Sequence, residues 1–544
     1  MGLRITTLIF GFTFLYSALV WNIFNIQIGH GEYYSAKASS IFNSSGVLSP
    51  TRGNIYFTDK NGGSISMAIN RESPVIFADT RHVDDVPEAV EKIAGIVDIS
   101  KEELSKLLSR KNDAYVPLVR KATASQVEYL KNEPVFGINV GYEPLRYYPF
   151  DKAAAHLLGY VSIDRSSSDG VYGVELGHNK SLKGISGNVS ADGFQPPQNG
   201  EDLYLTIDRN IQSQAEEIMK RLIDNFHAEG GTVMVNNPKT GQLLAMASFP
   251  TFDPNDYGKY SIADFLNPAA QAVYEPGSVF KVITMAAGID AGKITPDTTF
   301  YDTGFFVLNG RTVKNWDLKA HGTMTMTNVI EKSLNTGAAY AEKMTGHKTF
   351  YDYLVKFGFK DITGADLPGE VRGSLGNLEK NARDINFATA SFGQGISVTP
   401  LQLLQAMSAI ANHGVMMKPY VDGSLEPEEI RRVITDETSQ KVVDMMVSAV
   451  DKAEIAKVNG YTVAGKTGTA QVPDLKVGGY THDVINTYVG FAPAHDPAFV
   501  ILIKLNKPPG APLAGLTVVP AFQELAQFIL NYYNIPPDNI KGQH

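Results

Sequence analysis

Hydrophobic positions fall into one long uncharged run and many shorter periodic stretches. The long run covers residues 5–28 and contains no charged side chain. About 20 mostly apolar residues are enough for a helix to cross the core of a bilayer. Trp21, Tyr33 and Tyr34 stand where amphipathic aromatic side chains would meet the outer interface. The pattern therefore predicts a single transmembrane anchor over residues 5–28, preceded by a short cytoplasmic tail over residues 1–4.

Two other interpretations of this run are a cleaved signal peptide and a buried core helix. The letters "AKA" at 36–38 resemble a cleavage site, but they follow a run already longer than the apolar segment of a signal peptide. Arg4 and the amino terminus are the only positive charges before the run, which favours a cytoplasmic N-terminus. No second run of this kind follows, so we expect the rest of the chain to be periplasmic or extracellular.

Residues 29–200 mix short β-like stretches with charged helical ones such as "DDVPEAVEKIAGIVDISKEELSKLLSRK". They end in "SADGFQPPQNGED", a polar stretch with proline and glycine that is typical of a linker or surface loop. A chain of 544 residues is also too long for one ordinary domain. We therefore expect a mixed α/β unit over residues 29–200, a second domain over 201–535 and a C-terminal tail over 536–544.

From residue 202 the pattern changes to alternating strands and amphipathic helices. "LYLTI" predicts a strand, and Asp208 is placed to cap a helix through "RNIQSQAEEIMKRLIDNF". "GTVMVNN" and "QLLAMAS" flank "PKTG" and predict two strands joined by a turn. "AFVILIKL" predicts a further buried strand, and "PAFQELAQFILNYY" a closing helix. These elements predict an α+β fold with an antiparallel sheet and helices.

Composition narrows the class of protein. Hydrophobic residues make up 43% and charged residues 19%, as in globular proteins with sizeable cores. The net charge of -9 argues against a nucleic-acid partner, which usually requires a basic surface. The sequence has no cysteine, which excludes disulfides, thiolate catalysis and cysteine-ligated metals. The 11 histidines form no ligand-spaced cluster, so we expect neither a metal nor another cofactor.

The stretch "EPGSVFKVIT" at 275–284 contains the first candidate for chemistry. Ser278 and Lys281 are three residues apart, so on a helix they share one face. A serine hydroxyl needs a base, and an amine serves as one only when desolvation or a nearby cation keeps it neutral. Pro276 and Gly277 suit a turn into a helix N-terminus, whose free N–H groups could stabilise an oxyanion. Taken alone, the pattern also fits a capping serine with an exposed lysine.

Two later stretches carry further polar groups. "EKSLNTG" holds Ser333 and Asn335, which could lie in a loop between two helices. "YTVAGKTGTAQ" holds a cation, two hydroxyls and a glycine at the end of a β-like run, contributed by Lys466, Thr467, Gly468 and Thr469. At a strand edge beside a cleft, these groups could hold an extended substrate, and the glycine would let it approach the backbone. Either stretch alone could be a cap or a turn, and "PKTGQ" at 238–242 is interpreted as such a turn.

In this order the three patterns are those of penicillin-binding proteins and class A β-lactamases. The chain resembles the class B penicillin-binding proteins over nearly its whole length. The segments that resemble their transpeptidase domain are "EPGSVFKVIT", "SLNTG", "SFGQGISVTPLQL", "GKTGTAQ", "LTIDRNIQ", "PKTGQLLAMASFPTFDPN" and "NTYVGFAP". "AAAHLLGYVS" and "YGVELGHNKSLKGISG" resemble the N-terminal pedestal of the family. The resemblance implies an α+β transpeptidase domain like that of serine β-lactamases, preceded by an elongated pedestal over residues 29–200.

The resemblance also implies roles for these residues. Ser278 matches the acylated nucleophile, and Lys281 matches its general base. Ser333 matches the residue that relays a proton to the leaving D-alanine. Asn335 assists it and contacts the amide of the substrate.

The Lys-Thr-Gly stretch matches the electropositive edge that holds the terminal carboxylate of the substrate. Lys466 and Thr467 hold this carboxylate and tune the relay, beside Gly468, and Thr469 is a further contact. The backbone N–H groups of Ser278 and Thr469 match the oxyanion hole.

The implied activity is peptidoglycan D,D-transpeptidation on stem peptides that end in D-Ala-D-Ala. Penicillins and other β-lactams would acylate the same serine. The implied partners are a polytopic glycan polymerase of the shape, elongation, division and sporulation class and other division-complex membrane proteins. "YEPGS" and "GKTGTAQ" favour the division-type subgroup over the elongation type.

Four alternatives stay open at this point: a β-lactamase, a D,D-carboxypeptidase, a bifunctional class A enzyme and a non-catalytic scaffold. "EKSLN" fits a Glu-x-x-Leu-Asn pattern of class A β-lactamases, but it overlaps the Ser-x-Asn stretch, so we interpret it as coincidence. One departure concerns the pedestal, where the family usually carries Arg-Gly-x-Ile-x-Asp-Arg. This chain has "RGNIYFTDKNG", with Phe57 and Thr58 in place of the Asp and Arg, which puts a pedestal ion pair in doubt.

Overall fold

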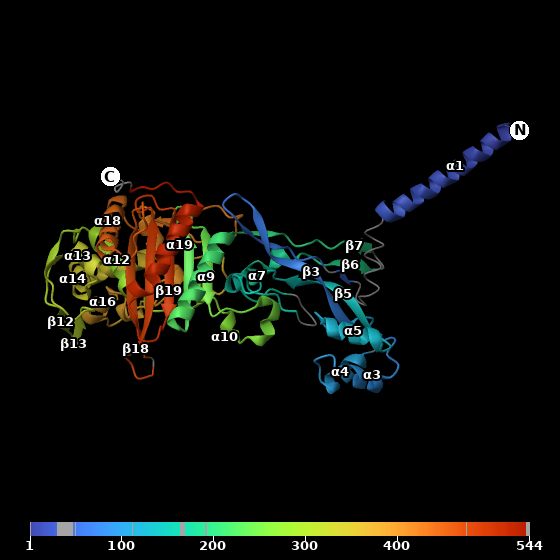
Figure 1. The fold of residues 1–544 in the computed structure, drawn as a ribbon, viewed down its shortest axis with the longest axis horizontal. Helices are drawn as coiled ribbons and strands as arrows, with labels where there is room; N and C mark the ends of the chain where they lie inside the picture. The colour runs from blue at the N-terminus through green and yellow to red at the C-terminus, as the bar shows by residue number, and fades with distance from the viewer. Residues whose placement is uncertain are drawn as a thin grey trace.

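The computed structural model describes residues 2–29, 47–48, 50–110, 112–163, 169–190, 193–474 and 476–539. Helix α1 stands apart at one end, strands β3 and β5 lie in the middle, and the domain that contains β18 and β19 forms the other end (Figure 1). The α+β fold with a preceding pedestal and one N-terminal apolar helix is confirmed.

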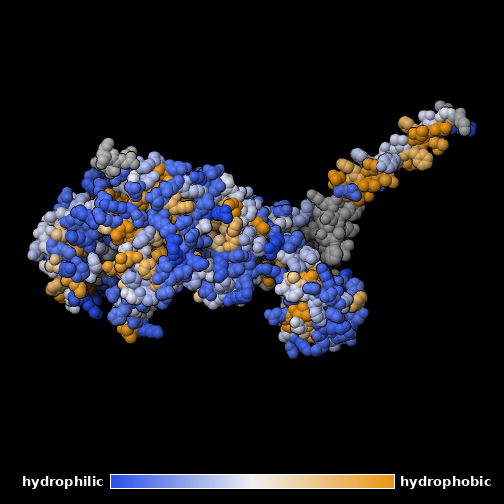
Figure 2. All heavy atoms as spheres, in the orientation of Figure 1, coloured by the Kyte–Doolittle hydropathy of each residue, from blue (hydrophilic) through white to orange (hydrophobic). Residues whose placement is uncertain are grey.

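Helix α1 covers Gly2–Phe24 and continues as a short π-helical segment, Asn25–Gly29. Its large apolar side chains are exposed, and they make it one of the most hydrophobic surfaces in Figure 2. Among the described residues it is the one helix long and apolar enough to cross a bilayer. Lipid is the solvent that such a surface suits, so the helix suggests a single-pass membrane anchor.

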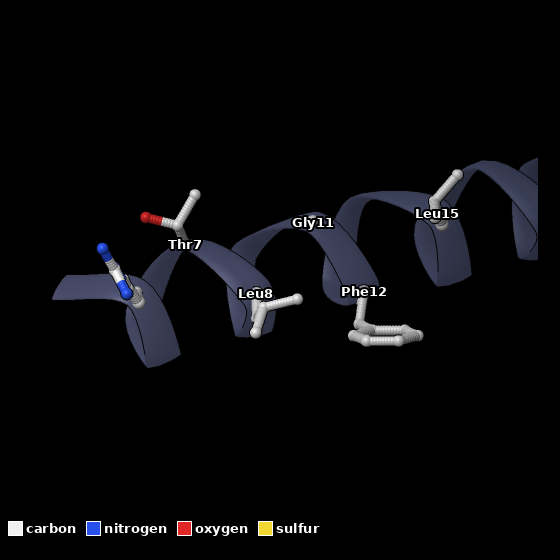
Figure 3. Close-up of a pocket in the computed structure, with 6 residues that line it drawn as sticks. Thr7, Leu8, Gly11, Phe12 and Leu15 are labelled. Atoms are coloured by element: carbon white, nitrogen blue, oxygen red, sulfur yellow. The ribbon is translucent and has the colours of Figure 1, made fainter. Parts of the chain in front are cut away.

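One flank of α1 has a shallow hollow, which Figure 3 shows from the side. It is lined by Arg4, Thr7, Leu8, Gly11, Phe12 and Leu15. Gly11 contributes no side chain there, and no other atom fills the place where its Cβ would be. The hollow belongs to the apolar helix and has no residue in common with the candidate catalytic groups.

The pedestal is built on a long strand, β3 (Ser64–Ala78). This strand pairs antiparallel with β2 (Ile55–Thr58), β4 (Val116–Val119) and β5 (Ile138–Tyr147). Helices α3 (Val86–Ile93), α4 (Lys101–Leu108) and α5 (Ala124–Asn132) contribute to a separate apolar cluster with its strands. The shorter elements are β1 (Val47–Leu48), α6 (Ala155–Leu158), α7 (Gly173–Gly177), α8 (Asn179–Lys183), β6 (Gly187–Ser190) and β7 (Gly193–Gln195).

A buried ion cluster holds the pedestal strands to α7. Glu175 is fully buried and accepts hydrogen bonds from Arg52 Nε at 2.8 Å and Arg146 Nε at 2.6 Å. Tyr148 donates its hydroxyl to the same carboxylate at 3.1 Å. Arg52 also donates to Asn179 at 2.8 Å. The pedestal therefore has a buried ion pair, formed by residues outside the two positions that the sequence comparison put in doubt.

Those two positions have other roles in the structure. Phe57 is fully buried in the apolar core that continues into the catalytic domain. Thr58 donates its hydroxyl to the carbonyl of Leu205 at 3.1 Å. Leu205 lies in β8 (Leu203–Asp208), which pairs in parallel with β2 and leads directly into α9. Phe57 and Thr58 therefore both help to join the pedestal to the following domain. The domain boundary predicted at residue 200 stays a prediction.

The second domain contains an antiparallel sheet with the strand order β10-β9-β19-β18-β17. The strands are β9 (Gly230–Asn236), β10 (Leu243–Phe249), β17 (Ala464–Pro473), β18 (Tyr480–Ala492) and β19 (Phe499–Asn506). Helices α9 (Arg209–Phe226) and α19 (Val518–Tyr532) pack together on one face and share its apolar core. Asp208 caps α9 by accepting from the backbone N–H groups of Asn210 and Ile211, at 2.8 and 3.2 Å. The strands and helices predicted from the sequence for this layer are confirmed.

Helix α17 (Pro400–Ala411) covers the other face of the sheet and contacts β9 and β19. Further helices belong to the same domain. They are α10 (Ile262–Phe265), α11 (Pro268–Gln271), α12 (Lys281–Asp290), α13 (Met326–Lys332), α14 (Asn335–Thr345), α15 (His347–Lys356), α16 (Asp384–Ala390) and α18 (Asp436–Ala453). Short strands outside the sheet are β11 (Thr299–Asp302), β12 (Phe305–Leu308), β13 (Arg311–Lys314), β14 (Gly322–Thr325), β15 (Val415–Met417) and β16 (Glu429–Arg432). The 3₁₀ segments are η2 (Pro254–Lys259), η3 (Gly277–Phe280), η4 (Gly376–Leu378) and η5 (Ala514–Leu516).

Candidate active site

The first candidate residue stands in a tight turn that leads into a buried helix. Ser278 lies in the 3₁₀ segment η3, and Lys281 begins α12 directly after it. In a 3₁₀ turn the side chains at i and i+3 eclipse each other, so this spacing places Lys281 above Ser278. Ser278 is partly exposed, while Val279 and Phe280 are buried. The local fold thus presents the serine hydroxyl at the surface and anchors the residues that follow it.

Lys281 connects the first candidate stretch to the second. Its Nζ lies 3.0 Å from Ser278 Oγ, 2.6 Å from the backbone oxygen of Ser333 and 3.2 Å from Ser333 Oγ. The side chain is fully buried, as a neutral amine requires. Burial, together with the positive charge of Lys466, lowers the pKa of Lys281 well below its usual value. A neutral amine has two N–H donors and one lone pair. It can therefore donate twice to Ser333 and accept the proton of Ser278.

Ser333 lies in the connection between α13 and α14, as predicted from the sequence. Its backbone is left-handed, with φ 56° and ψ 46°. This conformation is uncommon for a residue other than glycine and persists where the surroundings hold it. The next residue, Leu334, is fully buried. Asn335 opens α14 and donates from Nδ2 to the carbonyl of Lys314 at 2.8 Å, which leaves one amide N–H and its Oδ1 for a ligand.

The third candidate stretch lies within β17, the last strand of the sheet order. Lys466 is 3% exposed, and its Nζ lies 3.1 Å from Ser333 Oγ and 3.0 Å from the backbone oxygen of Thr467. Burial lowers the pKa of Lys466 to about 7. Thr467 and Thr469 are partly exposed, and Thr469 Oγ1 accepts from the backbone N–H of Ala514 at 3.3 Å.

Gly468 packs closely against the turn that carries Ser278. A Cβ at this position would lie 2.9 Å from the carbonyl of Pro276 and 2.9 Å from Val279 Cγ2. The missing side chain therefore lets β17 pack directly against η3, which carries Ser278. The approach of a ligand to Gly468, expected from the sequence, stays a prediction.

The structure joins four of the predicted side chains in one continuous chain of contacts. It runs from Ser278 to Lys281, then to Ser333, and ends at Lys466. The chain combines three segments that are 52 and 133 residues apart in sequence. The part of this chain from Ser278 through Lys281 to Ser333 can move a proton between the two hydroxyls, because each of these groups can both give and take one when Lys281 is neutral.

Glu331 of the "EKSLN" stretch is engaged elsewhere. Its carboxylate accepts from Ser448 Oγ at 2.6 Å and from Asn328 Nδ2 at 2.8 Å. Ser448 belongs to α18, so this carboxylate is used in packing α13 against α18. The contacts support the interpretation that the β-lactamase-like pattern is a coincidence.

Two features near the site were missed in the sequence analysis. Glu275 accepts from the backbone N–H of Gly395 at 3.0 Å and from the hydroxyl of Tyr480 at 3.0 Å, and burial raises its pKa. It thus ties the segment before Ser278 to the loop of Gly395 and to the start of β18. The other feature is the hairpin of β12 and β13, which the Asn309–Gly310 pair signals as a two-residue turn.

Comparisons with known proteins agree with this geometry. The family model described as penicillin binding protein transpeptidase domain matches residues 231–526, more than half of the chain. The model of the penicillin-binding protein dimerisation domain matches residues 47–205.

Relatives and solved structures cover almost the whole chain. It is 32% identical to the stage V sporulation protein D of Bacillus subtilis, over 93% of this chain and 83% of that protein. It is 27% identical to the peptidoglycan D,D-transpeptidase FtsI of Escherichia coli, over 94% and 88%. The crystal structure of penicillin binding protein 3 from Mycobacterium tuberculosis in complex with ampicillin has a TM-score of 0.72 at 28% identity, and covers 91% of this chain and 98% of its own. The chain belongs to the penicillin-binding protein transpeptidase family, as a class B member of the division-type subgroup.

Proposed function

We propose that this protein is a membrane-anchored serine D,D-transpeptidase that cross-links peptidoglycan stem peptides at the division septum. The observation that carries the proposal is the buried Lys281 amine, which lies within hydrogen-bond distance of both Ser278 Oγ and Ser333 Oγ. A neutral amine between two hydroxyls is the arrangement that serine activation followed by protonation of a leaving group requires.

In the acylation step, Ser278 Oγ attacks the carbonyl carbon of the penultimate D-alanine. Lys281 takes the proton of the hydroxyl as the new C–O bond forms. The C–N bond to the terminal D-alanine then breaks, and Ser333 donates a proton to the departing nitrogen while Lys281 returns one to Ser333. Lys466 stays cationic and holds the substrate carboxylate, with Thr467 and Thr469 beside it.

The second half-reaction uses the same groups in reverse. An amine on a neighbouring stem peptide attacks the acyl-enzyme carbonyl and loses its proton through Ser333 to Lys281. The C–O bond to Ser278 breaks, and the serine recovers its proton. In both steps the backbone N–H groups of Ser278 and Thr469 would stabilise the developing oxyanion, and losing one such donor typically costs ~2.7–4 kcal/mol.

The first experiment labels the full-length protein in detergent with a fluorescent penicillin. We expect one covalent label per wild-type chain, none on Ser278→Ala, and wild-type labelling of Ser424→Ala, a matched change at an exposed loop serine. Labelling that survives Ser278→Ala would exclude this nucleophile, and a wild-type protein that never labels would favour the non-catalytic scaffold. An amine acceptor should then speed turnover of the acyl-enzyme above hydrolysis, which separates a transpeptidase from a carboxypeptidase or a β-lactamase.

We also propose that the catalytic domain lies outside the cytoplasm and that α1 and the pedestal contact a polytopic glycan polymerase. The exposed apolar surface of α1 and the charge of Arg4 before it support this orientation. The cysteine-free sequence allows a clean test with single cysteines. In spheroplasts, a membrane-impermeant maleimide should label Ser424→Cys and leave Gly2→Cys unlabelled until the membrane is permeabilised. The reverse pattern would exclude the orientation.

A further inference from the structure

The segment of residues 302–321 packs against the loop that carries Ser333. It is the outer part of a pair of short hairpins: β11 pairs with β14 at its base, and β12 pairs with β13 at its tip. Figure 1 shows this tip at the far end of the domain. Because the segment contacts residues on both sides of Ser333, it can determine where the Ser333 hydroxyl lies.

Asp302 is the centre of these contacts. Its carboxylate is 1% exposed. Oδ1 accepts from Thr336 Oγ1 at 2.7 Å and from the backbone N–H of Gly304 at 2.9 Å. Oδ2 accepts from Asn315 Nδ2 at 2.8 Å and from the backbone N–H of His321 at 3.1 Å. Four donors around a buried carboxylate offset the cost of its desolvation. A side chain at position 302 that itself carries a donor would face these four donors without an acceptor.

Asn315 extends the network to the backbone of the Ser333 loop. Asn315 is 1% exposed, and its Oδ1 accepts from the backbone N–H of Thr336 at 3.2 Å. Its neighbours make two more attachments. The carbonyl of Lys314 accepts from Asn335 Nδ2 at 2.8 Å, and Trp316 Nε1 donates to the carbonyl of Lys332 at 3.0 Å.

Together these contacts hold residues 332, 335 and 336, on either side of Ser333. Ser333 has the left-handed backbone that needs such external support, and its hydroxyl must reach Lys281 at 3.2 Å and Lys466 at 3.1 Å. A shift of about 1 Å at a reacting group can cost ~10²-fold in rate. The contacts of the 302–321 segment are therefore placed to control the proton relay without touching it.

We propose that Asp302, acting through Thr336 and Asn315, is a positioning residue for the proton relay at Ser333. This inference rests on the proposed function, because it concerns protonation of the leaving group by Ser333. It adds a residue that lies outside the three sequence patterns and contacts neither Ser278 nor either lysine in the described part of the chain. Asp302→Asn keeps the shape of the side chain but directs an amide donor at two of the four donors.

The test uses two acyl donors that differ only in the leaving group. One is a D-Ala-D-Ala amide, whose nitrogen must be protonated as it leaves, and the other is the matching thioester, whose thiolate leaves without a proton. For full-length Asp302→Asn in detergent we expect the amide rate to fall ~10²-fold, as for a relay group displaced by about 1 Å. The thioester rate should change less than threefold. Ser333→Ala should show the same selectivity for the leaving group.

Asp317→Asn is the matched control, because Asp317 lies in the same segment but pairs with His321, at 2.9 Å, instead of the Ser333 loop. It should react with both donors at the wild-type rate. If Asp302→Asn does not fold, Thr336→Val replaces it and should show the selective loss, while Thr336→Ser keeps the hydroxyl and should restore the amide rate.

Two results would overturn the inference. Wild-type rates on both donors would show that Asp302 does not influence the relay. An equal loss on both donors would assign Asp302 a general role in the fold of the site. Neither result would affect the assignment of Ser278, whereas failure of the wild-type protein to form an acyl-enzyme would reject the proposed function itself.

Discussion

The molecule contains two buried groups of cationic side chains, one in the pedestal and one in the transpeptidase domain, and they differ in what balances the charge. In the pedestal, Arg52 and Arg146 surround the carboxylate of Glu175. In the transpeptidase domain, Lys281 and Lys466 share hydroxyl and carbonyl oxygens, and no carboxylate within the described residues forms an ion pair with either. Arginine cannot lose its proton in a protein, whereas lysine readily shifts its pKa when buried.

The difference separates a stabilising site from a reactive one. In the pedestal group the guanidinium charges are paired with a carboxylate. The group can therefore join strands to α7, but it offers no base to a reaction. Burial without a counter-charge lowers the pKa values of both lysines, so an amine becomes available as a base. Three predictions sharpen this comparison, beginning with the largest effect.

Replacing Lys281 with methionine should slow the reaction strongly while leaving the fold intact. Loss of a general base typically costs 10²–10⁴-fold, so we expect acylation by a fluorescent penicillin to slow by about 10³-fold. The free energy of unfolding should change by less than about 1 kcal/mol, because methionine fills a similar volume and removes a costly buried amine. Stopped-flow labelling and chemical denaturation of the full-length protein measure the two quantities. A large loss of stability would show that the contacts of the Lys281 amine stabilise the fold, which would contradict the comparison.

Replacing Glu175 with glutamine should have the opposite outcome. It leaves two buried guanidinium groups without a counter-charge, and breaking a buried pair in this way costs about 3–5 kcal/mol. We expect a lower denaturation midpoint of the pedestal transition and an unchanged rate of acylation at Ser278. Glu91→Gln, at an exposed pair with Lys101, is the control and should cost at most about 1 kcal/mol. A wild-type midpoint for Glu175→Gln would contradict the stabilising role.

The pH dependence of acylation should show a smaller but diagnostic effect. The second-order rate should fall at low pH as Lys281 becomes protonated, since only the neutral amine accepts a proton. It should also fall as pH rises through about 7, where Lys466 of the free enzyme loses the charge that holds the carboxylate. Below the acidic pKa and above the alkaline pKa, each further pH unit should lower the rate about tenfold. A substrate without a carboxylate should lose the alkaline limb, and if the limb persisted, its assignment to Lys466 would be wrong.

The two Lys-Thr-Gly stretches show how far sequence reasoning could go. Lys239 stands in the turn between β9 and β10, is 48% exposed and pairs with Asp496 at 2.5 Å. Lys466 has the same tripeptide but is 3% exposed beside Ser333. The flanking residues were sufficient to separate the two, because only the second copy has a glycine before it and a threonine after it, whereas the first joins two predicted strands. The burial that lowers the pKa of Lys466 comes from segments distant in sequence, so it could not be predicted from the residues next to Lys466.

The strands and helices of the catalytic sheet were predictable because their apolar periodicity is strong and local. The contacts of Asp302 and Asn315 were not predictable, because their partner Thr336 lies 21 or more residues further along the chain. The pedestal ion pair that the structure contains could not be predicted for a similar reason. Phe57 occupied a position expected to carry charge, while the actual carboxylate, Glu175, lay 123 residues away from Arg52.

Three glycines around the turn that carries Ser278 restrict which substitutions this protein can tolerate there. A Cβ at Gly393 would lie 2.3 Å from the carbonyl of Gly277, and one at Gly277 would lie 2.9 Å from Ala470 Cβ. One at Gly468 would lie 2.9 Å from the carbonyl of Pro276. Any substitution at these positions would move the turn that carries Ser278 and would harm the natural substrate together with the drug. We therefore expect resistance to an inhibitor to arise through side chains at other positions, while these three glycines stay fixed.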